Sequence, residues 1–161
     1  MLCDAAARRV VEQLVREARR SDYANSRVAE TARGLLVEAA ASHVKAGLGR
    51  ALALTNPARE SVPESLAAGH LHLAGLPAPV FQHRISSRIG SLYPDAYWPE
   101  FNLIGECDGA VKYTKAAAYV DEKVREQVLR DLGYRVVRWL ATEIMFTPWV
   151  VVERVARALG L

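Results

Sequence analysis

The chain has 161 residues, of which 51% are hydrophobic, and this is enough for a globular protein with an apolar core. The 21 Lys and Arg residues exceed the 18 Asp and Glu residues by only three, so the net charge alone does not indicate a nucleic-acid-binding protein. Two cysteines are too few for a disulfide scaffold. No apolar run approaches the ~20 residues of a membrane span, and no signal-peptide pattern is present, so we expect a cytoplasmic protein.

The front of the chain, residues 1–56, is predicted to be a helical extension or connector. Apolar residues recur at helical spacing over residues 4–20, with arginines on the other side of the helix. Asn56-Pro57 breaks this pattern, and we place the start of a second domain there, over residues 57–161. Charges opposite an apolar stripe are typical of any solvated helix, so this part indicates no chemistry. Two more helices are expected before the break, over residues 28–45 and 48–54.

The second domain is predicted to be of the α/β class, with a central mixed sheet flanked by helices. Ser61 and Glu64 have the spacing of a capping box, so a helix is expected to begin there and to end at Gly75. The expected order is helix, three-strand antiparallel meander, helix, strand, helix. The expected elements are strands at 80–85, around Asp95 and at 101–108, a helix at 115–132, a strand at 134–140 and a helical region at 142–159.

An unusual number of acids falls in residues 94–112, PDAYWPEFNLIGECDGAVK, which are predicted to form a hairpin that turns within WPEF. Facing residues in an antiparallel pair have numbers with a constant sum, and this turn places Asp95 opposite Glu106. Asp108 has the same parity as Glu106, so the three acids are expected on one face. Like charges at such positions are destabilising unless water, a proton or a cation relieves them, and a divalent metal is the obvious candidate.

The second domain resembles a known family. The segments VPESL, AGLP, DAYWPE, GECDGAVKY and DEKVREQVLRDLGYRVVRW are similar to the very-short-patch-repair-like endonucleases of the PD-(D/E)XK restriction-endonuclease superfamily. This resemblance covers about residues 58–161. It implies a restriction-endonuclease-like core and metal-dependent hydrolysis of DNA phosphodiester bonds, with Mg²⁺ or Mn²⁺ as the cofactor. Hard oxygen ligands favour these ions over zinc.

The same resemblance assigns metal ligands to residues of the hairpin. Asp95, which follows Pro94, matches the acid of the "PD" motif and would bridge the metal. Glu106 matches the second acid. Cys107 would contribute its backbone carbonyl, while its side chain points to the opposite face.

Three further residues complete the implied site. Asp108 stands where the superfamily has a lysine, and Lys112 falls where relatives often have histidine and would supply the missing positive charge. An exposed lysine after a glycine turn is also commonplace. Glu64 matches an acid on the first helix that points into such sites, although its capping-box role explains it equally well.

On the next helix, Glu122 is spaced to pair with Arg125, and Glu126 is spaced to pair with Arg130. The alternative is that Lys123 or Arg125 contacts a phosphate.

Three functions follow as alternatives. The first is a Mg-dependent endodeoxyribonuclease, with Glu64, Asp95, Glu106, Asp108 and Lys112 as catalytic residues. The second is a non-catalytic DNA-binding or antitoxin-like regulatory module that retains the nuclease fold. The third is a structural fragment, because the front helices resemble the connector to a type IV antitoxin-like winged helix that is not recognisable here. The implied partners are DNA and either a cognate toxin or a missing N-terminal DNA-binding head, and no membrane is expected.

Overall fold

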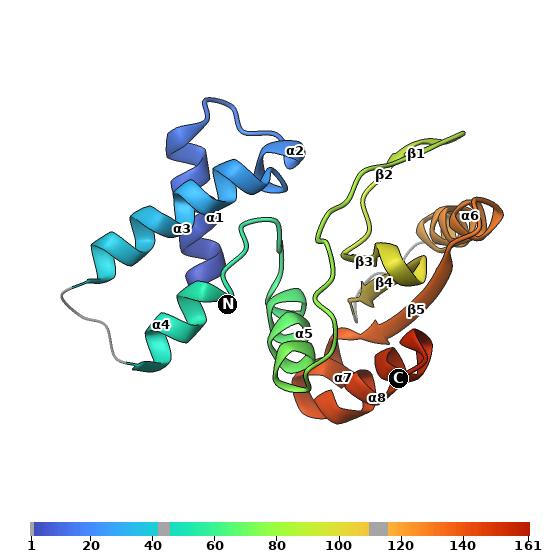
Figure 1. Ribbon diagram of the computed structural model, residues 1–161. Helices are drawn as coiled ribbons and strands as arrows, with labels where there is room; N and C mark the ends of the chain where they lie inside the picture. The colour runs from blue at the N-terminus through green and yellow to red at the C-terminus, as the bar shows by residue number, and fades with distance from the viewer. Residues whose placement is uncertain (1, 42–45, 110–115) are drawn as a thin grey trace. The chain divides into compact units, whose positions relative to one another are not determined.

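The computed structural model describes residues 2–41, 46–109 and 116–161, and the protein is a mixed α/β structure, as predicted. The chain divides into two compact units, Met1–Ser65 and Leu66–Leu161 (Figure 1). The first unit extends past the predicted boundary at residue 57, because Pro57 and Arg59 contact the first helix through Arg8 and Asp4. None of the helices in the described ranges is long and apolar enough to span a membrane.

Helices make up the first unit. They pack around a small core of Val11, Tyr23 and Ala32. The first helix is shorter than expected and stops at Leu14, before Glu17 adopts a positive φ of 55°. The helices are α1 (Leu2–Leu14), α2 (Arg20–Tyr23), α3 (Ser26–Ala40), α4 (Ala46–Ala53) and the first turn of α5 (Val62–Leu73).

The second unit is built on a three-stranded mixed sheet of order β3-β4-β5. β3 (Ala96–Trp98) pairs antiparallel with β4 (Leu103–Asp108), and β4 pairs parallel with β5 (Arg135–Leu140). α6 (Ala116–Asp131) connects the two parallel strands. The mixed sheet predicted from the sequence is therefore confirmed.

The register of the β3–β4 hairpin is the predicted one. Ala96 faces Gly105 and Trp98 faces Leu103, so the residue numbers of each pair sum to 201. A 3-10 turn over Pro99–Phe101 joins the strands, at the predicted WPEF turn. Continuing the register by one pair beyond Ala96 brings Asp95 opposite Glu106.

The expected three-strand antiparallel meander is present only in part, because it is interrupted between β2 and β3. β1 (Ile85–Ser87) and β2 (Gly90–Leu92) form a separate two-stranded sheet. An isolated antiparallel bridge between Val80 and Tyr97 has the same register as β1 and β2, and Ile85 and Leu92 belong to the same buried cluster as Ile104 of β4. Between the bridge and β1 the strand is interrupted at Gln82, whose φ of 52° is not that of an extended strand.

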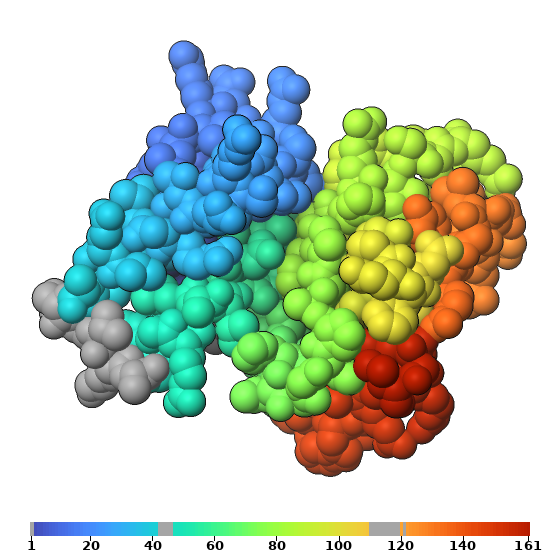
Figure 2. All heavy atoms as spheres, in the orientation of Figure 1, coloured from blue at the N-terminus to red at the C-terminus, as the bar shows by residue number. Residues whose placement is uncertain are grey.

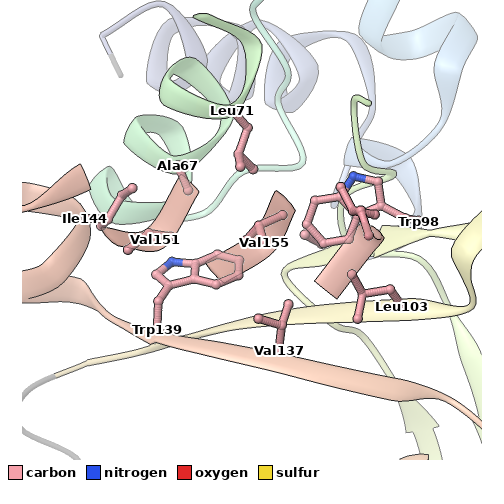
Figure 3. Packing of buried hydrophobic residues seen from close by; sticks show 11 residues of the cluster. Ala67, Leu71, Trp98, Leu103, Val137, Trp139, Ile144, Val151 and Val155 are labelled. Atoms are coloured by element: carbon pink, nitrogen blue, oxygen red, sulfur yellow. The ribbon is translucent and has the colours of Figure 1, made fainter. Parts of the chain in front are cut away.

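The main core lies on one face of the sheet. α5, α7 (Ala141–Phe146) and α8 (Pro148–Leu159) cover the side chains of this face, among them both Trp98 and Trp139 (Figure 3). α6 covers the other face through Val128 and Leu129, which pack with Ile104. The carboxyl end of β4, with Glu106 and Asp108, therefore lies on the α6 side.

Candidate functional site

Asp95 and Glu106 form a close pair of carboxyl groups at the open end of the β3–β4 hairpin. The Cys107 backbone N–H donates to Asp95 Oδ2 over 2.8 Å, which fixes the Asp95 side chain beside β4. Glu106 is only 7% exposed. Its burial, and next the negative charge of Asp95, raise the pKa of Glu106 to about 8. The ionised form of Glu106 is thus disfavoured beside Asp95, as expected for like charges at facing positions.

Arg125, on α6, is the first of two cations that stabilise the negative charge of these acids. One of its Nη atoms lies 3.2 Å from Glu106 Oε1 and 3.0 Å from the carbonyl oxygen of Tyr93. Its Nε is buried and has no hydrogen-bond partner among the described residues. The side chain is 32% exposed, so Arg125 connects the buried carboxyl group with the surface.

Arg138, on β5, is the second cation and lies opposite Glu106 in the parallel register. It donates to both carboxylate oxygens of Asp108, with one distance of 2.9 Å. The same guanidinium also binds Glu122 at 2.6 Å and Glu126 at 3.3 Å, both on α6. A single arginine therefore joins β4, β5 and α6 around the acidic face, by which we mean the face of the sheet that carries Asp95, Glu106 and Asp108.

The three acids do share one face, and the structure relieves their repulsion with two arginines. Arg138 was not predicted as part of this site. The alternation of side chains in its strand was a local signal, but the register of β5 against β4 was not predictable from it. Helical spacing also predicted a pair of Glu122 with Arg125, whereas Glu122 binds Arg138 and Arg125 binds Glu106. The predicted pair of Glu126 and Arg130 is present at 2.8 Å.

The other predicted residues lie in different places. The Cys107 side chain packs against the main core, on the face opposite to Glu106, as predicted. Glu64 belongs to the first unit, where its two oxygens accept from the Glu60 backbone N–H at 2.9 Å and from the Ser61 hydroxyl at 2.6 Å. These are contacts of a helix cap, and a catalytic role of Glu64 stays a prediction. Lys112 lies outside the described residues.

The donor set at the hairpin fits a hard divalent cation in part. Two carboxyl groups, with the Cys107 carbonyl next in the chain, offer the oxygen ligands that Mg²⁺ and Mn²⁺ prefer. Asp108 is a weaker candidate ligand, because Arg138 engages both of its oxygens. In the part of the chain that the structure describes, no group of three or more His, Cys, Asp and Glu side chains is arranged for a metal. An ion held here would therefore take its remaining ligands from backbone carbonyls and water.

Comparisons of this chain with protein-family models, with curated proteins and with solved structures found no match. The function is therefore argued from the geometry of the acidic face and from its charges.

Proposed function

We propose that the second unit is a metal-dependent endonuclease with a restriction-endonuclease-like core, which hydrolyses DNA phosphodiester bonds. The observation that carries this proposal is the pairing of Asp95 with the buried Glu106, whose pKa is raised to about 8. Strongly perturbed carboxyl groups cluster at functional sites, because stability alone rarely favours burying one acid beside another. The resemblance to the very-short-patch-repair-like family supports the same reaction.

Asp95 and Glu106 would hold a Mg²⁺ or Mn²⁺ ion, with the carbonyl of Cys107. Such an ion, when bound, polarises a phosphate and lowers the pKa of a bound water molecule. The residues of the chain have separate tasks. The Cys107 N–H orients the Asp95 carboxylate, and Arg125 favours the ionised form of Glu106, which is the form that binds a cation.

Arg125 is also suited to the role that a lysine has in the superfamily. Asp108 stands at the lysine position and is bound by Arg138, so the partly exposed cation beside Glu106 is Arg125. A guanidinium group there would offset the negative charge that develops on a phosphate in the transition state. Lys112 is the second candidate for this role.

The test is nicking of supercoiled plasmid DNA with and without Mg²⁺. We expect Asp95→Asn and Glu106→Gln to lose at least about a hundredfold in rate, because each removes a charged ligand. Glu100→Gln is the matched control, since Glu100 is an exposed acid at the turn of the same hairpin. Titration calorimetry with Mn²⁺ gives a second readout, in which the two site variants should lose binding. Equal activity of all four proteins would overturn the proposed site.

A second candidate is a DNA-binding or antitoxin-like module that keeps the fold without catalysis. One observation favours it: Arg125 and Arg138 pair with Glu106 and Asp108, so these two acids have cationic partners within the protein. This candidate predicts that DNA binding in EDTA survives both Asp95→Asn and Glu106→Gln, while the wild type shows no nicking in Mg²⁺.

A further inference from the structure

The β1–β2 hairpin is a narrow ribbon whose base is anchored in a buried hydrophobic cluster. Ile85 and Leu92 face each other across the ribbon and are buried in the cluster that contains Val128 and Leu129 of α6. Beyond this pair, the remaining side chains up to the turn are exposed or only partly buried. In Figure 1 the ribbon leads away from β3, and in Figure 2 its lime-green atoms form an outer rim of this unit beside the orange α6. The ribbon thus has an accessible face and tip.

Its charge is of one sign. No Asp or Glu occurs in the sequence between Glu64 and Asp95, whereas the hairpin contains Arg84 and Arg88. Arg88 is 67% exposed, and its pair with Asp131 at 3.1 Å is a surface ion pair of the kind that contributes little energy. The ribbon itself is therefore basic, and the acid that pairs with its Arg88 is Asp131 of α6.

The side chains of the ribbon alternate between its two faces, so residues two apart in the sequence lie on the same face. Ser86 and Ser91 face each other and are both exposed, and Arg84 has the same parity and donates through Nε to Ser91 Oγ over 2.9 Å. One face of the ribbon therefore presents hydroxyl groups and a guanidinium group. Ile89, at the turn, is 49% exposed and offers an apolar tip.

These properties match double-stranded DNA. The major groove is wide enough for a two-stranded β-ribbon. Arginine binds phosphates and the acceptor edge of guanine, serine binds base edges or phosphates, and an apolar side chain contacts the thymine methyl group. No acid on the ribbon would repel the phosphates.

We propose that the β1–β2 hairpin enters the major groove of duplex DNA, with Arg84 and Arg88 as its phosphate or guanine contacts and Ile89 at its tip. This inference rests on the proposed function for the choice of DNA as the ligand. It adds the element that holds the duplex, which is separate from the acids that would cut it.

The test is fluorescence anisotropy of the full chain with a labelled DNA duplex in EDTA, over a series of salt concentrations. We expect the double variant Arg84→Gln/Arg88→Gln to bind roughly tenfold more weakly. The slope of log K against log salt should fall by about 1.8 if both arginines contact phosphates, because each such contact contributes about 0.9. Ile89→Ser should weaken binding with an unchanged slope, since it removes no charge.

Arg157→Gln is the matched control. Arg157 lies on α8, is 76% exposed and forms one surface ion pair with Glu153, as Arg88 does with Asp131. Its affinity for DNA should equal that of the wild type. Thermal unfolding should confirm that the hairpin variants are folded, because the buried anchors Ile85 and Leu92 are unchanged.

Two results would overturn the inference: an unchanged affinity of the double variant, or an equal loss in Arg157→Gln. Binding of single-stranded DNA in preference to the duplex would also overturn it. The outcome is independent of cleavage. If the protein binds duplex DNA through the hairpin but does not nick DNA in Mg²⁺, only the proposed nuclease function is overturned. If it nicks DNA but its affinity for DNA is unchanged in the hairpin variants, only this inference is overturned.

Discussion

Glu106 makes the stability of the second unit depend on pH. Its pKa is about 8 in the folded protein and about 4.5 in the unfolded chain, so between these values the folded state holds a proton that the unfolded state has lost. The free energy of unfolding therefore falls as pH rises through this window. We expect Glu106→Gln to remove most of this dependence, because an amide imitates the protonated carboxyl group.

Thermal unfolding followed by circular dichroism, from about pH 4.5 to about pH 8, checks this expectation. The variant should gain stability over the wild type as pH rises. Glu100→Gln is again the control, because an exposed acid should leave the pH dependence as it is. If the midpoints of wild type and Glu106→Gln change with pH in the same way, the raised pKa of Glu106 is contradicted.

Gly105 is the residue that lets the two core tryptophans approach the hairpin. A Cβ atom at this position would lie 2.8 Å from the Trp139 ring and 3.0 Å from the Trp98 ring, both of which are buried. Gly105→Ala should therefore lower the free energy of unfolding by about 1–3 kcal/mol. Gly109→Ala, where an added Cβ meets nothing within 4 Å, is the control. Urea unfolding measures both, and equal stability of the two variants would contradict this packing.

At the scale of elements, Arg138 holds α6 to the sheet. It is the common partner of Asp108, Glu122 and Glu126, so Arg138→Met would leave three carboxylates without their shared cation. We expect a loss of about 1–3 kcal/mol, below the value for a fully buried pair because the guanidinium is partly exposed. Arg130→Gln removes an exposed i,i+4 pair with Glu126 and should cost no more than about 0.5 kcal/mol. Similar urea midpoints for both variants would show that the ion pairs of Arg138 contribute little to the free energy of unfolding.

The elements also show how far the sequence determines this site. The register of the acidic hairpin was predictable, because a short turn and the strict alternation of side chains leave few pairings. The parallel pairing of β4 with β5 depends on contacts across a whole helix, so the position of Arg138 beside the acids did not follow from local patterns. The meander is interrupted at Gln82, whose positive φ of 52° could not be predicted from its residue type.

At the scale of the whole molecule, each unit has its own buried core. The first unit packs around Val11 and the second around the two tryptophans and Val155. We therefore expect two unfolding transitions in calorimetry rather than one. A substitution in one core should then shift one transition only.

Asp4 supplies the substitution for the first unit. It is buried, accepts from the Asn56 backbone N–H at 2.9 Å and pairs with the buried Arg59 at 2.7 Å. Asp4→Asn removes the negative charge from this buried ion pair, which should lower the free energy of unfolding by about 3–5 kcal/mol, whereas replacing an exposed acid has little effect. The transition of the first unit should fall, and that of the second should keep its midpoint. Gly105→Ala should give the reverse pattern. A single transition that both variants lower equally would mean that the two units unfold together.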